Sequence, residues 1–258
     1  MMRTDRNALG IVIGLEARKL ARATVTRVAT IAALTLVVVT TAGGYAAAMY
    51  AGDTDMGRKA ASMVTSPGWD GYTTLGATSV SATILLAVGV VMSWSVGREF
   101  TDGTMVGLFA VPPTLRSIAA AKMTATLSWA ALLGVGEAAM LTTAGLMLGL
   151  GPAGAAGCFA VLALIAILLS ASVLPVMWAA TRWRGYLAGI GFTLAILVIT
   201  NLAAGFGLGS CIPWSIPIVW AAHQAEVGTP LLAVPVMTAA VGAWITYRSW
   251  DRLQLGAD

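Results

Sequence analysis

Six long apolar runs, each close to 20 residues or more, alternate with short polar segments along the chain. An α-helix needs about 20 apolar residues to cross the hydrocarbon core of a bilayer, so each run predicts one spanning helix. The predicted spans cover residues 28–49, 74–96, 118–148, 155–178, 186–206 and 229–247. The pattern therefore predicts an all-α membrane protein with a six-helix transmembrane domain over residues 28–247.

Several of these runs contain features that disturb a regular helix, among them Pro235 in the sixth. The third run is long enough to be tilted, or broken near residues 134–137. The fourth contains Pro175, which a membrane helix tolerates when neighbouring groups bond the carbonyls that proline leaves free.

The amino-acid composition argues against a water-soluble domain. Of 258 residues, 58% are hydrophobic and 10% are charged, whereas soluble domains carry roughly 25% charged residues. This number of charged side chains is too small to cover the surface of a protein in water. Most of the protein surface must therefore face lipid.

The positive charges fall on one side of the predicted topology. All but two of the 15 Lys and Arg residues lie in the N-terminal segment, the second and fourth loops or the tail, and only Arg58 and Lys59 fall on the other side. The positive-inside rule then places both termini in the cytoplasm, with residues 248–258 as a cytoplasmic tail. The net charge of +4 is thus explained by topology, and we expect no nucleic-acid partner.

Residues 1–27 precede the first span and are moderately amphipathic. Leu9, Ile13 and Leu20 share one helical face, and Arg18 and Arg22 lie roughly opposite. This pattern predicts an interfacial helix on the anionic inner leaflet; the alternative is a basic flank of the first span.

The densest polar loop, residues 97–117, carries more apolar side chains than a bare cytoplasmic loop should. Phe100, Met105, Leu108 and Phe109 lie among its charges, and Pro112 with Pro113 ends any helix begun before them. Either a partner protein buries these side chains, or the loop folds back on its own bundle.

Several kinds of chemistry have no residues to support them. None of the three lysines lies in the Gly-Lys-Ser/Thr context of a phosphate-binding loop, and His223 is the only histidine. Cys158 and Cys211 are interpreted as two unrelated cysteines. We therefore expect no catalytic residue, metal site or cofactor in this chain.

Inside the spans, Glu137 is the one deep ionisable residue. It is either a polar group in a substrate path or subunit interface, or a locally paired side chain on a tilted helix. At the start of the fifth span, Gly185 and Gly189 form a small-residue pair that predicts close helix approach.

The segment before the last span combines Pro213 and Pro217 with Trp214 and Trp220. Tryptophan prefers the membrane–water interface. A re-entrant or interfacial helical piece that gates an exit fits this pattern, and simple aromatic anchoring is the alternative.

Three short motifs resemble one family, the ABC-2 type permeases. The loop "REFTDGTMVGLFAVPPTLRSIAAAK" resembles their cytoplasmic loop, with Lys122 opening the third span, and Glu16, Lys19 and Leu20 resemble their element before the first span. "CIPWSIPIVW" is similar to a segment of permeases from bacitracin- and lantibiotic-resistance exporters.

The resemblance implies a half-transporter of type V exporter architecture in a bacterial cytoplasmic membrane. A second permease copy or a related permease would complete the channel, and separate ABC ATPase subunits would bind ATP and Mg. The loop would act as a coupling helix seated in the ATPase. Its implied contact residues are Glu99, Phe100, Asp102, Gly103, Thr104, Met105, Leu108, Phe109, Pro112 and Arg116.

The expected cargo is an amphiphilic antimicrobial peptide or drug, by analogy with the resistance exporters. The alternative within the same class is a lipid, a glycan or another cargo. Alternatives from other classes are an ion- or proton-driven carrier and a non-transporting scaffold; too few intramembrane charges argue against the first, and the loop pattern argues against the second.

Overall fold

The computed structural model describes residues 2–110, 113–222 and 228–254, and these residues form helices with no strand among them. The elements in chain order are α1 (Met2–Arg22), α2 (Thr24–Val38), the π-helix η1 (Val39–Gly43), α3 (Gly44–Tyr50), α4 (Asp55–Ala61), α5 (Gly68–Thr101), α6 (Met105–Phe109), α7 (Leu115–Met147), α8 (Ala155–Ser172), α9 (Pro175–Arg182), α10 (Tyr186–Gly205), the 3-10 helix η2 (Gly209–Cys211), α11 (Ile216–Ala222), the 3-10 helix η3 (Thr229–Leu232) and α12 (Ala233–Asp251). The all-α prediction is confirmed.

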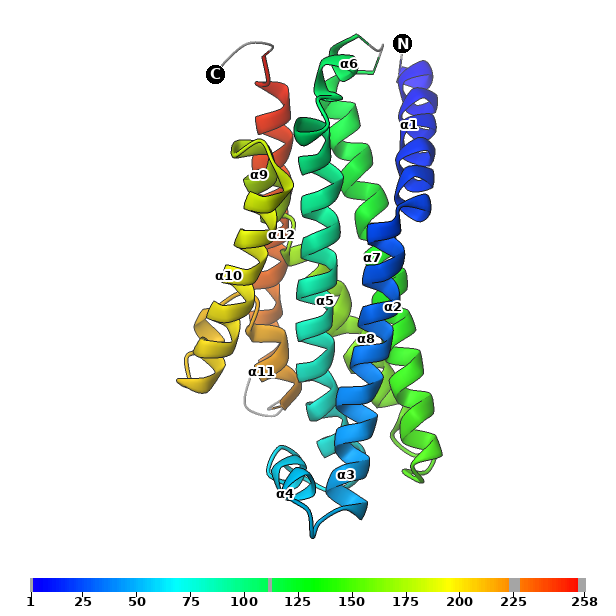
Figure 1. Ribbon diagram of the computed structural model, residues 1–258, viewed down its shortest axis with the longest axis vertical. Helices are drawn as coiled ribbons and strands as arrows, with labels where there is room; N and C mark the ends of the chain where they lie inside the picture. The colour runs from blue at the N-terminus through cyan, green and yellow to red at the C-terminus, as the bar shows by residue number, and fades with distance from the viewer. Residues whose placement is uncertain (1, 111–112, 223–227, 255–258) are drawn as a thin grey trace.

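Among the described residues, six helical stretches are long and apolar enough to cross a membrane, which confirms the predicted number of spans. They are Thr24–Tyr50, Gly68–Thr101, Leu115–Met147, Ala155–Arg182, Tyr186–Ala204 and Thr229–Asp251. Both chain ends lie at one end of the bundle (Figure 1), here called the termini end; α3 and α4 lie at the opposite end.

The second span, α5, is the central helix of the bundle (Figure 1). It packs against α2, α7, α8, α9 and α10. At about 1.5 Å per residue its 34 residues extend roughly 50 Å. That length exceeds a hydrocarbon core of about 30 Å, so the helix projects beyond it and carries Glu99 to the termini end.

Glycines let α5 and α10 approach each other closely. A Cβ at Gly189 would lie 2.6 Å from Ser93 Oγ, and one at Gly97 would lie 2.1 Å from the Tyr186 backbone. Gly89 faces Thr193 in the same way. Such distances exclude any side chain, so the close approach predicted at Gly189 is confirmed; Gly185 makes no comparable contact.

The third span is not broken. α7 runs without interruption through residues 134–137. At Gly134 it packs closely on α8, since a Cβ there would lie 2.5 Å from the Ala166 Cβ. A glycine in this helix therefore serves helix packing rather than a bend.

The fourth span is the one that breaks. α8 ends at Ser172 and α9 begins at Pro175. The Val176 N–H bonds to the Val173 carbonyl, which leaves the Ser172 carbonyl free, and the Trp214 indole donates to that carbonyl at 3.0 Å. A neighbouring side chain thus satisfies the backbone group that the break releases.

The first span also departs from a regular α-helix, because η1 inserts a π-helical turn between α2 and α3. π-turns are rare and accommodate an extra residue within a helix. Thr41 within it is fully buried, and its hydroxyl has no partner in the described part of the chain.

The helix predicted before the first span is present as α1, which runs along the bundle axis beside the upper part of α7 (Figure 1). Its buried face is formed by Val12, Glu16 and Leu20, while Ile11 and Leu15 are exposed. An acidic side chain therefore lies at the centre of its contact with the bundle, and its placement on a membrane surface stays a prediction.

Candidate functional site

A buried lysine joins three helices near the termini end. Lys122 lies about two turns into α7, and its side chain is 3% exposed. Its Nζ donates to Glu16 Oε2 on α1 at 2.9 Å, to Glu99 Oε1 on α5 at 2.7 Å and to the Ser95 carbonyl at 3.0 Å. An ammonium group has three donors, so every one of them is used.

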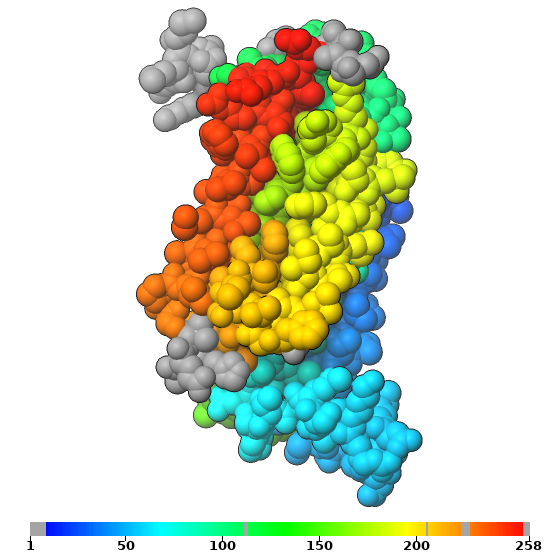
Figure 2. Space-filling view, turned by 90° about the vertical axis from the view of Figure 1, so that its left-hand side faces the viewer, coloured from blue at the N-terminus to red at the C-terminus, as the bar shows by residue number. Residues whose placement is uncertain are grey.

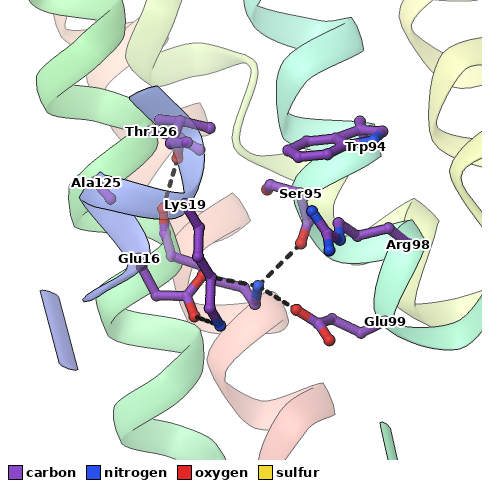
Figure 3. A pocket seen from close by; sticks show the side chains of 10 residues that line it. Glu16, Lys19, Trp94, Ser95, Arg98, Glu99, Ala125 and Thr126 are labelled. Carbon is purple, nitrogen blue, oxygen red and sulfur yellow. Dashed lines mark hydrogen bonds and ion pairs between the residues drawn. The ribbon is translucent and has the colours of Figure 1, made fainter. Parts of the chain in front are cut away.

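The two carboxylates are themselves held in place. Glu16 accepts a second bond from Lys19 at 2.6 Å, and Glu99 accepts one from Thr104 Oγ1 at 2.5 Å. Figure 3 shows Glu16 and Glu99 approaching the same point from different helices. We call Glu16, Lys19, Glu99, Thr104 and Lys122 the ion cluster.

Local sequence explains why these groups meet. Thr114 caps α7 by accepting a bond from the Ser117 N–H at 3.3 Å, which fixes where the helix begins. Lys122 and Thr126 are one helical turn apart and are both buried, so one face of α7 turns towards α1 and α5. Burying a charge without partners costs several kcal/mol, and this requirement selects the paired arrangement.

The space beside the ion cluster is small. A cavity of about 20 Å³ is bordered by the four charged residues of the cluster together with Trp94, Arg98, Ala125 and Thr126. That volume holds about one water molecule. The cluster therefore connects helices and does not accommodate a transported molecule.

The predicted coupling residues divide into two groups. Glu99 is buried in the ion cluster, and Phe100, Met105 and Leu108 are half-buried against the core of their own bundle. The remaining described positions are exposed or half-exposed: Asp102, Gly103, Thr104, Phe109 and Arg116. Pro112 lies outside the described residues.

Part of the loop thus folds back on its own chain, the alternative that the sequence left open. Among the described residues of this tip, the large apolar side chain that is exposed is Val106, in the middle of α6 and 64% exposed. Sequence reasoning passed over it, although a hydrophobic residue on a five-residue helix between charged segments was a usable signal.

Two pairings between residues far apart in the sequence were not foreseen. Asp251 at the end of α12 forms a two-pronged ion pair with Arg116 at the start of α7, and so connects the last span to the loop. Lys122 and Glu16 were noted only as motif positions. Their meeting could have been inferred from the rule that an ionisable group next to an apolar run needs a partner.

Glu137 lies deeper in α7 and is fully buried. Thr83 of α5 donates to its Oε2 at 3.2 Å, and its Oε1 has no partner in the described part of the chain. Thr83 also borders an apolar groove of about 360 Å³ between α2 and α5. The carboxyl group therefore lies one side chain behind that groove.

The proline–tryptophan segment forms the helical piece that the sequence indicated. α11 contains Pro217 and the buried Trp220, and it packs against α5 and α8. Pro213 and Trp214, just before it, are half-buried. This placement makes the segment part of the bundle wall away from the termini end (Figure 1).

The fold and the ion cluster define a class: a polytopic α-helical membrane protein whose spanning helices are tied together at one end by buried charges. A family model described as ABC-2 family transporter protein matches residues 12–201. The match covers more than half of the chain, and the chain belongs to that family. No curated protein matches it.

Membership confirms the resemblance to ABC-2 type permeases. The loop motif and the element before the first span both lie inside the matched residues. The chain is a membrane-spanning permease subunit of an ABC transporter, and permeases of this family work with ABC ATPase partners. The matched region contains all five residues of the ion cluster.

Proposed function

We propose that this permease exports its cargo with energy from separate ATPase subunits that dock on the termini end and bind ATP and Mg. The observation that carries the proposal is the placement of α6. Its exposed face presents Val106, while Met105 and Leu108 rest on the bundle. An exposed apolar side chain on a short, supported helix is suited to insertion into a groove of a partner.

Force on α6 can reach the spans through the ion cluster. Thr104, next to α6, bonds Glu99, and Glu99 shares Lys122 with Glu16. A displacement of α6 therefore acts on α1, α5 and α7 together, which is how a contact between subunits produces rigid-body motion. In this arrangement Glu99 is a positioning residue rather than a contact of the ATPase.

For the cargo, we favour an amphiphilic antimicrobial peptide or drug. The groove between α2 and α5 is lined almost wholly by apolar residues, and Thr83 and Thr24 are its polar members. Apolar lining suits the hydrophobic part of an amphiphile. It suits a lipid equally well and a glycan poorly, so lipid export is the second candidate.

We place the permease in the bacterial cytoplasmic membrane with the termini end inside, because the positive charges gather there. Cys211, which is exposed on the far side, should then react with an impermeant thiol reagent added outside intact cells. Labelling only after cell lysis would reverse the orientation.

Co-purification with an ABC ATPase encoded beside this chain tests the docking proposal. Val106→Asp should lower recovery of the ATPase at least about tenfold, because a charge would enter the buried centre of the interface. Met56→Asp is the matched control, since Met56 is an exposed apolar residue on the short helix α4 at the opposite end.

A second variant separates docking from transmission. Glu99→Gln should keep the ATPase bound but reduce cargo-stimulated ATP hydrolysis, because the contact face is intact while the link to Lys122 is weakened. If Val106→Asp retained both the complex and coupled hydrolysis, the docking proposal would fail.

A further inference from the structure

A basic cavity lies on the side of the bundle, between α9 and α12 near the termini end. Its volume is about 260 Å³, and its lining consists of Trp178 from α9 with Trp244, Ile245, Arg248, Ser249 and Arg252 from α12 and its C-terminal cap. Figure 2 shows this face, with α12 in orange and red beside α9 and α10 in yellow-green and yellow. None of its lining residues belongs to the ion cluster or to α6.

The two arginines that line this cavity give it a net positive charge. Arg248 lies over the Trp244 ring at 5.5 Å. Within the described part of the chain, neither Arg248 nor Arg252 lies within ion-pair distance of a carboxylate. Both interact electrostatically with the adjacent Asp251, whose carboxylate is paired with Arg116. An anion in the cavity would therefore meet two guanidinium groups and the Ser249 hydroxyl.

An exposed apolar stripe leads along α12 to the same cavity. Met237, Val241 and Trp244 are each more than half exposed, and their spacing places them on the helix face that continues to Arg248. From Met237 to Arg248 the stripe is about 16 Å long at a rise of 1.5 Å per residue. That length matches one leaflet, roughly half of a 30 Å hydrocarbon core.

We propose that this cavity binds one anionic phospholipid. Its phosphate lies between Arg248 and Arg252, and an acyl chain lies along Trp244, Val241 and Met237. Basic pockets between spanning helices recognise anionic headgroups, and tryptophan suits the level of the headgroup. A soluble anion would use the arginines but leave the stripe without a role, and an acidic segment of a protein could not follow the stripe into the membrane.

The test compares lipid binding by the purified full-length permease and two charge-matched variants. Native mass spectrometry would be used to titrate dioleoyl phosphatidylglycerol and dioleoyl phosphatidylcholine. Arg248→Gln/Arg252→Gln should weaken phosphatidylglycerol binding at least about tenfold and leave phosphatidylcholine binding unchanged. Arg18→Gln/Arg22→Gln, which removes two exposed charges from α1, should leave both unchanged.

Two further variants keep the test decisive if the glutamine pair folds poorly. Arg248→Lys/Arg252→Lys keeps the charge and should bind phosphatidylglycerol within a few-fold of the unmodified chain. Trp244→Ala shortens the stripe at an exposed position and should weaken binding about threefold.

The proposal is overturned by any of three results. The first is equal weakening by the control pair, which would indicate general charge attraction. The second is displacement of phosphatidylglycerol by millimolar inorganic phosphate, which would indicate a soluble-anion site. The third is loss of ATPase co-purification from Arg248→Gln/Arg252→Gln with lipid binding unchanged, which would indicate a protein contact.

Discussion

Helix α7 contains two buried ionisable side chains whose surroundings differ sharply. Lys122 donates to three acceptors from two other helices, whereas Glu137 accepts from one hydroxyl and leaves its second oxygen without a partner in the described part of the chain. They lie roughly 22 Å apart along the helix axis. The first site holds three helices together. The second makes one hydrogen bond to a neighbouring helix, so bonding between helices does not explain a carboxyl group at this depth.

The largest effect should come from removing Lys122, the buried cation of the ion cluster. Lys122→Met leaves the carboxylates of Glu16 and Glu99 buried against each other, and breaking a buried ion pair in this way costs about 3–5 kcal/mol. We expect a large loss of folded permease, measured by thermal unfolding and gel filtration in detergent. Lys59→Met, at an exposed lysine, should behave as the unmodified chain; similar stability of both variants would show that the cluster does not hold the bundle together.

A smaller effect is expected from removing one carboxylate at a time. Glu16→Gln and Glu99→Gln should each cost about 1.5–3 kcal/mol, the range for hydrogen bonds to charged groups, because Lys122 keeps the other carboxylate. The double variant leaves the cation with neutral acceptors alone, so its cost should exceed the sum of the two. Simple additivity in unfolding measurements would mean that the two carboxylates do not share the lysine.

The smallest effect on stability should come from Glu137. Glu137→Gln keeps the bond from Thr83 and should change stability by less than about 1 kcal/mol, and Glu137→Leu should be neutral or stabilising. The same unfolding assay checks both variants. A loss as large as that of Lys122→Met would contradict the comparison, and would show that Glu137 also holds helices together.

The contrast also shows what a sequence can and cannot predict. Six apolar runs were enough for the number of spans, because the cost of exposing polar backbone to lipid leaves a helix as the solution for each run. Local exceptions were harder. Pro175 could be recognised in the sequence as a point where a helix can break. The hydrogen bond from Trp214 to the carbonyl freed by that break could not be predicted, because Trp214 lies in a segment far along the chain.

The candidate site was predictable residue by residue, but its assembly was not. Motif resemblance singled out Glu16, Glu99 and Lys122 separately, and Glu99 was expected to face a partner protein. The apolar run ends near residue 96, whereas α5 continues as a regular helix to Thr101 and turns Glu99 inwards to Lys122. The pattern of apolar and polar residues does not show which face at the end of a helix is buried. Because Glu99 lies on the buried face, it bonds Lys122 instead of facing a partner protein.

The glycine contacts between α5 and α10 have a consequence for how the protein is made. Gly89 and Gly97 are covered by Thr193 and Tyr186, residues synthesised only after two further spans have left the ribosome. Until the fifth span is inserted, this face of the central helix has no native neighbour and must be shielded by lipid or by the insertion machinery. Final packing of the core is therefore a late event in biogenesis. A chain truncated before α10 would expose this face of α5, and membrane quality control could recognise it.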